Sequence, residues 1–413
     1  MVSWEGSKDH GVYTKLGVHH ILPEGVARED LSSIMVQESI LIALDQMKQC
    51  SDAPEDEGCQ DDLTYIWRGE GRFPKESVTL ATQFSVNRLE RFERSIPLWP
   101  GAISVAIYLT QPEDAMILRR YLEDPVKGKL YRAFHLTIVQ PRYESGPRPK
   151  HLSYPINHLR NLAVQAVTTT HHLLIDGDFS PDPGMYSFLH SQGMGKGRGP
   201  TLDPSFLDPT ERNTAWVIPC VAIPLSYTGA PPGNVTHLRE LFRGGNAYIT
   251  DPRAGHGPTG TRLFLSPLLT MGSMRGTYEV CYESQWEPYY ILPRDTGPLW
   301  DARFRDQGGD KQEHALVLNA LGWRFRVLHD SFLYHIDHPQ WRWPGGKDPN
   351  LEGHDQDEEK REVEGEGKEE WSYFNGFSQE IRRVFGETVK WPRACSQPLY
   401  VSSQVSVEGI GLL

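Results

Sequence analysis

Short apolar runs and amphipathic segments alternate along the chain from Val78 onward. The apolar runs, which are typical of strands, cover residues 78–84, 102–109, 133–140 and 171–175. Segments with helical spacing lie between them, at residues 87–96, 112–124 and 154–167. Strands that alternate with helices of about ten to fifteen residues predict βα units and a mostly parallel sheet. We therefore expect an α/β, Rossmann-like fold in which helices flank the sheet.

The later part of the chain is richer in loops but continues this pattern. Strands are expected at residues 215–223, at one or two places within 278–294, and at 324–336. A helix is expected at residues 310–322, where a glycine closes it. A last helix is expected at residues 371–387, because four aromatic residues and Ile381 recur there on one side.

Four segments of the chain differ in character. Residues 1–75 are expected to be an N-terminal extension with one surface helix near residues 31–49. Residues 76–344 carry the alternating pattern and are expected to form one ligand-binding domain with loop insertions. Residues 345–370 are strongly charged and poor in apolar residues, which predicts a disordered acidic loop. Residues 371–413 are expected to return to the core through the last helix and to end in a tail.

Composition and charge narrow the function classes. The chain has 413 residues and a formal net charge of -12. No basic tract stands out, which argues against nucleic acid or an anionic membrane surface as a general partner. No apolar run approaches the roughly 18 residues of a membrane helix, and the first residues lack the apolar core of a signal peptide. We therefore expect no membrane segment in this chain.

Five cysteines are spread along the chain without a C-x-x-C pair, which argues against a structural zinc site. Cys50 and Cys59 flank a short acidic stretch and could form a local disulfide in an oxidising lumen. Asn234 begins one N-x-T sequon, and such a triplet alone says little about secretion.

The apolar run at residues 171–175 ends abruptly in Asp176, Gly177 and Asp178. In a parallel sheet, ligands bind beyond the carboxyl ends of the strands, so both acids are expected on the ligand face. Two carboxylates that flank one small residue can converge on a hard divalent cation, which shares its ligand shell with substrate phosphates. The alternative is that this triplet is only a turn that ends a strand.

A second pair of candidate metal ligands lies late in the chain. The expected strand that ends near residue 336 carries His335 and is followed by His338. A histidine at the end of a late strand can complete a metal site that an earlier D-x-D motif opens. We therefore expect Asp176, Asp178, His335 and His338 to hold Mn²⁺ or Mg²⁺.

Four blocks, in this order, carry a resemblance to a known family. They are the L-R-N triplet at residues 159–161, the D-x-D-F-x-P block at 176–181, the W-E-P-Y block at 286–289 and the H-x-x-H ending at 335–338. Together with the sequence around them, from Val78 to Pro339, they resemble the LARGE-type glycosyltransferases, glycosyltransferase family 49. The resemblance implies a GT-A fold for residues 76–344 and Mn²⁺-dependent inverting transfer from a UDP-sugar. It also implies UDP-glucuronic acid as the usual donor, an Asp176 that leans toward the nucleotide ribose, and a glycan or glycoprotein acceptor. It further implies a place in the Golgi or secretory lumen, with the cytoplasm as the alternative because no signal or anchor is seen.

Several polar residues are candidates for binding the nucleotide-sugar donor. Asn157, Arg160 and Asn161 fall at the start of a helix, where N–H groups and a guanidinium can face an anion. Their alternative role is helix capping and surface pairing. Thr82 and Gln83 end the first strand and are expected to meet the uracil or the ribose, with ordinary hydrogen bonding at a strand end as the alternative.

Three acids compete for the role of the general base that an inverting transfer needs. Glu287 lies in the W-E-P-Y block, Asp310 opens the expected helix at residues 310–322, and Glu283 lies just before the block. Asp310 stands where the family is expected to carry Asn, and its alternative role is a helix N-cap. We rank Glu287 first, Asp310 second and Glu283 third. Lys311 is expected to pair with a donor carboxylate or phosphate, or to be a solvated helix lysine.

Two other function classes compete with a glycosyltransferase. One is a catalytically silent binding protein that keeps the fold, against which the intact acids and histidines argue. The other is a metal-dependent phosphoesterase. That class needs more acids clustered with the D-x-D motif, and only Asp182 follows it closely, between two prolines that are expected to turn it away.

Overall fold

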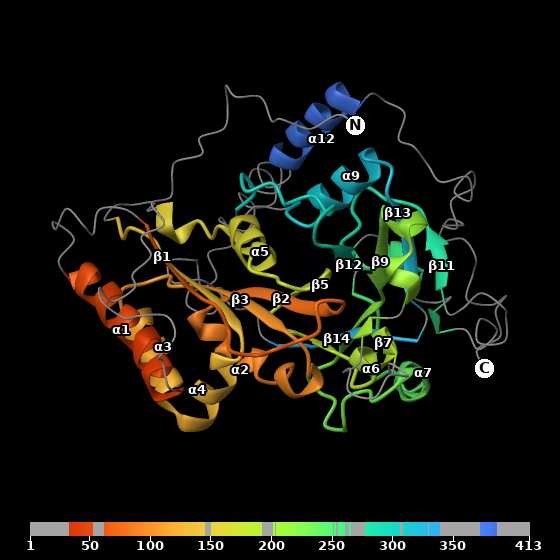
Figure 1. Ribbon diagram of the computed structural model, residues 1–413. Helices are drawn as coiled ribbons and strands as arrows, with labels where there is room; N and C mark the ends of the chain where they lie inside the picture. The colour runs from red at the N-terminus through yellow and green to blue at the C-terminus, as the bar shows by residue number, and fades with distance from the viewer. Residues whose placement is uncertain are drawn as a thin grey trace, which may run out of the picture.

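A computed structural model gives the arrangement of most of the chain (Figure 1). The structure describes residues 33–52, 62–144, 150–191, 201–202, 204–250, 252, 255–260, 264–265, 277–305, 309–328, 330–338 and 372–385. The expected acidic loop at residues 345–370 lies outside these ranges.

A large nine-stranded sheet forms the centre of the molecule, in the spatial order β1-β4-β3-β2-β5-β12-β9-β13-β11. The strands are β1 (Leu63–Trp67), β2 (Val78–Ser85), β3 (Ile103–Tyr108), β4 (His135–Gln140), β5 (His171–Asp176), β9 (Thr214–Ile218), β11 (Thr277–Val280), β12 (Tyr289–Pro293) and β13 (Arg324–Leu328). Strands β2, β3, β4, β5, β9 and β13 run in one direction, whereas β1, β11 and β12 run in the other. The expected α/β fold with a mostly parallel sheet is confirmed.

Two small sheets complete the strand structure. One contains β6 (Phe179–Pro181), β10 (Cys220–Ile223) and β14 (Leu333–Ile336), and the other contains β7 (His190–Ser191) and β8 (Thr201–Leu202). The expected single strands at residues 215–223 and 324–336 are wrong in one respect, because each is divided between the large sheet and a small one. Pro219, which has no N–H for a ladder bond, separates β9 from β10.

Helices surround the sheets (Figure 1). They are α1 (Ser33–Asp52), α2 (Leu89–Phe92), α3 (Asp114–Glu123), α4 (Pro125–Arg132), α5 (Ile156–Gln165), α6 (Met185–Leu189), α7 (Val235–Arg243), α9 (Gln312–Ala320) and α12 (Ser372–Phe385). The helix expected at residues 87–96 is shorter than predicted, since 3-10 turns flank α2 on both sides. No helix among the described residues is both long and apolar enough to span a bilayer.

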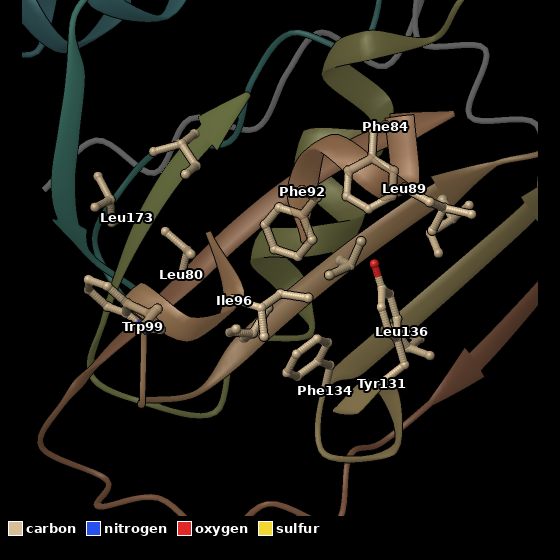
Figure 2. Close-up of a cluster of buried hydrophobic side chains, with 14 of the residues drawn as sticks. Leu80, Phe84, Leu89, Phe92, Ile96, Trp99, Tyr131, Phe134, Leu136 and Leu173 are labelled. Atoms are coloured by element: carbon tan, nitrogen blue, oxygen red, sulfur yellow. The ribbon is translucent and has the colours of Figure 1, made fainter. Parts of the chain in front are cut away.

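Strand β2 is buried on both faces, which explains its continuous apolar character. Leu80 and Phe84 point into one cluster with Phe92, Trp99 and other large side chains, as Figure 2 shows. Ala81, one position along, belongs to a separate cluster on the opposite face, against α5. The alternation follows from the two-residue period of a strand. It fixes the carboxyl end of β2 between two packed layers.

The segment expected as an N-terminal extension, residues 1–75, contributes to this core. Strand β1 pairs with β4 and forms one edge of the large sheet. Helix α1 packs on α3 (Figure 1) and buries Ile40, Leu44 and Met47 in the same cluster as β2. The helix expected near residues 31–49 is therefore present, and its buried face belongs to the body of the protein.

Helix α12 returns to the body near α9 (Figure 1). Phe374 and Phe377 join a core cluster that also contains Phe304, whose ring meets that of Phe377 edge-on at 5.4 Å. Gly309 has a φ of +94°, and a Cβ there would lie 2.7 Å from the Cβ of Phe374. Glycine therefore lets α12 pack closely against the chain that leads into α9.

Candidate metal and nucleotide-sugar site

The D-x-D turn lies where β2 and β5 end side by side. Gln83 on β2 is the register partner of Asp176 on β5. A Cβ at Gly177 would come within 2.8 Å of the Phe84 ring, so only glycine lets the turn pass this close to β2. The chain then enters β6 at Phe179, one residue after Asp178.

Asp178 lies beside the two histidines that the sequence pointed to. Its Oδ2 is 3.3 Å from Nε2 of His338, 4.0 Å from Nε2 of His335 and 3.4 Å from Nη1 of Arg88. One ligand atom from each of Asp178, His335 and His338 lies within 4.8 Å of the other two. A carboxylate with two imidazoles is a donor set that suits Mn²⁺ and other first-row divalent ions. These three residues therefore fit a metal site.

The three-stranded sheet of β6, β10 and β14 explains why His335 and His338 lie close to Asp178. His335 on β14 is the register partner of Phe179 on β6, and their rings lie 5.1 Å apart. On its other side, His335 is the partner of Ala222 on β10. Since β6 begins next to Asp178, the pairing of β6 with β14 brings the H-x-x-H segment to the D-x-D turn.

The carboxylate of Asp176 has other partners than the metal trio. The Tyr289 hydroxyl donates to its Oδ2 at 2.8 Å, Lys311 Nζ lies 3.3 Å from the same oxygen, and Arg160 Nη2 lies 3.1 Å from Oδ1. Burial alone would raise the pKa of Asp176, but the charges of Lys311 and Arg160 outweigh it and hold this pKa far below its usual range. Asp176 therefore stays ionised. Its expected role as a metal ligand stays a prediction.

Arg160 is a buried bridge between β5 and the chain before α9. Its Nη1 lies 2.5 Å from Oδ2 of Asp310 and 2.8 Å from Oδ1 of Asn157, and its Nη2 reaches Asp176. Its guanidinium lies over the ring of Trp300, 4.7 Å from the centroid, and the residue is only 1% exposed. This arrangement fixes Asp176 and Asp310 relative to each other.

The two asparagines next to Arg160 are also bonded inside the protein. Asn157 Nδ2 donates to Oε1 of Glu313 at 3.0 Å, and Asn161 exchanges hydrogen bonds of 2.8 Å with both backbone groups of Trp300. Helix α5 has no side-chain N-cap, so the alternative role of these residues as caps is wrong. They hold the segment around residue 300 against α5.

Replacing Arg160 with alanine is expected to lower the free energy of unfolding by about 3 kcal/mol, because it removes the buried cation that the half-buried carboxylates of Asp176 and Asp310 share. Chemical denaturation measures this difference. The matched control is Arg303→Ala, since Arg303 pairs with Asp301 and Glu380 but its side chain is 50% exposed. That change should cost under about 1 kcal/mol. Equal losses in the two variants would contradict the bridging role of Arg160.

Glu287 and Lys311 extend the charged network on the far side of Asp176. Lys311 Nζ lies 3.0 Å from Oε2 of Glu287, and Gln312 Nε2 donates to Oε1 at 2.6 Å. Burial would raise the pKa of Glu287, but the charge of Lys311 and its hydrogen bond to the carboxylate lower this pKa on balance. Glu287 is therefore an ionised acceptor next to Asp176. Lys311 is a bridging cation rather than a solvated lysine.

The other two candidate bases have different surroundings. Helix α9 begins at Gln312 with no side-chain cap, so the alternative role of Asp310 as an N-cap is wrong, and its carboxylate binds Arg160 instead. Glu283 lies in a turn where its carbonyl accepts from Trp286 N, and burial raises the pKa of its side chain. Within the described ranges, Glu283 takes part in no ion pair.

The strand-end residues of β2 are buried near the site. Thr82 is fully enclosed, and its hydroxyl has no hydrogen-bond partner among the described residues. Gln83 accepts a hydrogen bond from the Tyr154 hydroxyl and lies next to Asp176 in the sheet. Their expected contact with the uracil or ribose stays a prediction.

Besides Arg88, which pairs with Asp178, two residues of this site were not singled out from the sequence. Tyr289, inside the W-E-P-Y block, donates to Asp176. His256 is buried, its ring stacks on that of Tyr289 at 5.8 Å, and its Nδ1 has no hydrogen-bond partner in the described structure. Burial lowers the pKa of His256 to about 4, so its imidazole is neutral at pH 7. The W-E-P-Y block could have pointed to Tyr289, because it contains this residue. His256 lies in a loop whose sequence has no periodic pattern, so no sequence signal pointed to it.

Ligands of α/β sheets bind beyond the carboxyl ends of the strands, and Asp176 and Asp178 lie at the end of β5 beside the two histidines of the small sheet. The chain belongs to the glycosyltransferase family described as "Glycosyl-transferase for dystroglycan", whose model matches residues 129–362. It is 30% identical to human "Xylosyl- and glucuronyltransferase LARGE2" over 266 residues, which are 63% of this chain and 33% of that protein.

A further relative comes from another organism. The chain is 26% identical to the "Glycosyltransferase-like protein gnt14" of Dictyostelium discoideum over 275 residues, 66% of this chain and 39% of that protein. The chain thus spans about a third of the length of the curated relatives it matches. The match to the LARGE-type glycosyltransferases agrees with the resemblance seen in the sequence blocks.

Proposed function

We propose that the protein is a metal-dependent inverting glycosyltransferase that moves glucuronic acid from a UDP-sugar to a hydroxyl of a glycan or glycoprotein. The observation that carries the proposal is the convergence of Asp178, His335 and His338 beside the network around Asp176, in a chain of this family. The relatives named xylosyl- and glucuronyltransferases support a uronic acid or pentose donor. A GT-A arrangement accords with the α/β fold.

In this proposal the metal is held by Asp178, His335 and His338, and when bound it supplies charge stabilisation to the diphosphate. Asp176, which its cationic partners keep ionised, is proposed to accept hydrogen bonds from the ribose. Glu287, also ionised, takes the proton from the acceptor hydroxyl. Lys311 links Asp176 and Glu287, and so holds the distance between the nucleotide side and the acceptor side of the site.

The test is a panel of UDP-sugars with the purified protein and Mn²⁺, read as release of UDP. We expect UDP-glucuronic acid to give the highest rate, and a chelator to abolish release in a way that added Mn²⁺ restores. No UDP release from any donor, with or without a glycan acceptor, would favour a catalytically silent binding protein. Release that a chelator leaves unchanged would contradict metal dependence.

A metal-dependent phosphoesterase is the weaker alternative. It would need further acids at the metal site. Asp182 is the acid nearest in sequence, and its carboxylate accepts from Ser331 Oγ at 2.7 Å and from Phe332 N at 3.1 Å. It therefore ties the β6 end to the start of β14 rather than joining the metal trio.

We propose a Golgi or secretory lumen as the location. Cys50 and Cys281 each take part in a disulfide. Disulfides persist in oxidising compartments. Cys220 is a buried free thiol. The pairing of Cys50 with Cys59 stays a prediction, because Cys59 lies outside the described residues. The net charge of -12 accords with a glycan rather than a nucleic acid as the macromolecular partner.

A further inference from the structure

The outer side of the proposed metal site carries a tyrosine and a carboxylate that the mechanism above does not use. The hydroxyl of Tyr248 lies 2.9 Å from Oδ1 and 2.8 Å from Oδ2 of Asp337. Oδ1 of Asp337 in turn lies 3.6 Å from Nδ1 of His335. The opposite ring nitrogen of His335, Nε2, faces Asp178. The imidazole therefore lies between two carboxylates, one on each nitrogen.

Strand β10 explains how Tyr248 reaches Asp337. Tyr248 forms two backbone hydrogen bonds with Ala222, at 2.8 and 2.9 Å, and Ala222 is the register partner of His335 on β14. Residues paired in register across a sheet place their side chains on the same face. Asp337 lies two positions after His335 and is anchored by its N–H to the carbonyl of Ile223 at 2.9 Å.

The small side chain of Ala222 is the feature that allows this contact. Ala222 is fully buried and lies between Tyr248 on one edge of β10 and His335 on the other. A large residue there would stand between the tyrosine ring and the H-x-x-H segment. With alanine in this place, the Tyr248 side chain can cross the strand and close on Asp337.

A histidine that binds a metal through one nitrogen commonly donates its other N–H to a carboxylate, which fixes the tautomer and the ring orientation. We propose that Tyr248 and Asp337 form the outer support of the metal site, in which Tyr248 holds Asp337 and Asp337 orients His335 toward the cation. Both are positioning residues, since each is proposed to act on the cation through His335. This inference rests on the proposed metal-dependent function.

The experiment measures Mn²⁺ affinity by titration calorimetry of the full chain without donor or acceptor. Asp337→Asn should weaken Mn²⁺ binding about tenfold or more, and Tyr248→Phe about threefold, because outer carboxylates act directly on the ligand and the tyrosine acts through one of them. Tyr248→Phe removes no charge. A loss of Mn²⁺ affinity in this variant would therefore come from a changed orientation of Asp337 and His335, and not from a weaker electrostatic attraction of the cation. Tyr227→Phe is the matched control, because the Tyr227 hydroxyl donates to a carbonyl, that of Ala230, at 3.2 Å on the surface.

The double variant Tyr248→Phe/Asp337→Asn decides whether the two residues act in series. If Tyr248 acts through Asp337, the double variant should bind Mn²⁺ as Asp337→Asn does, without a further loss. Unchanged affinity in Tyr248→Phe, or losses that multiply in the double variant, would overturn the support role while leaving the metal site in place. If the wild-type chain itself bound no Mn²⁺, the metal site of the proposed function would fail with it.

Discussion

Replacing Asp178 with alanine is expected to lower Mn²⁺-dependent UDP release by about a thousandfold, which corresponds to roughly 4 kcal/mol of transition-state stabilisation. Asp178 is the only carboxylate of the proposed trio, and its Oδ2 faces both imidazoles. Without it the remaining histidines offer a weaker, purely nitrogen donor set. The rate is measured at saturating donor over a range of Mn²⁺ concentrations.

The same substitution should leave the fold intact, whereas Asp176→Ala should not. Asp176 pairs with the buried guanidinium of Arg160 and with Lys311, so its loss takes one of two carboxylates from each of these buried cations. Thermal unfolding separates the two effects, because only Asp176→Ala should lower the melting temperature strongly. Asp295→Ala serves as a control, since that side chain is 80% exposed and pairs with its neighbour Arg294. Full activity of Asp178→Ala in Mn²⁺ would contradict the proposed metal site.

The periodic part of the fold could be predicted from the sequence because its signals are local. The apolar run of β5 and the helical spacing of α5 each depend on neighbours in the chain, and both elements are present. The position of the D-x-D motif at a strand end followed from the same pattern. The division of residues 324–336 between two sheets could not be predicted, since an apolar run does not show which sheet each half joins.

The inner side of the candidate site depends on contacts between distant segments. Arg160 was expected to face an anion of the donor, but its bond to Asp310 needs α5 and the chain before α9 to pack together, 150 residues apart in sequence. His256 comes from a loop whose sequence has no periodic signal, and only the fold brings it to Tyr289. Residues of this kind can be recognised as part of the site only when the structure shows that their polar atoms are buried there.

Replacing Glu287 with glutamine is expected to reduce turnover by a hundredfold or more with donor binding retained, because an amide cannot take the acceptor proton. Of the three candidate bases, Glu287 is ionised and joined to Asp176 through Lys311. The variant keeps the size of the side chain and can still accept from Gln312. Initial rates at saturating acceptor, and UDP affinity by calorimetry, give the two quantities.

The paired variants Asp310→Asn and Glu283→Gln distinguish a base from a structural acid. Asp310 holds buried Arg160, so its amide variant should lose about 1 to 3 kcal/mol of unfolding free energy and weaken the site indirectly. Glu283 forms no ion pair in the described part of the chain, and its amide variant should turn over normally. If Glu287→Gln kept its turnover while Asp310→Asn lost it at unchanged stability, the base would be Asp310, and Glu287 would serve only to hold Lys311. The stability measurement separates a structural acid from a general base. Removing either kind of acid lowers the rate. Only the removal of an acid that orients a buried arginine also weakens the fold.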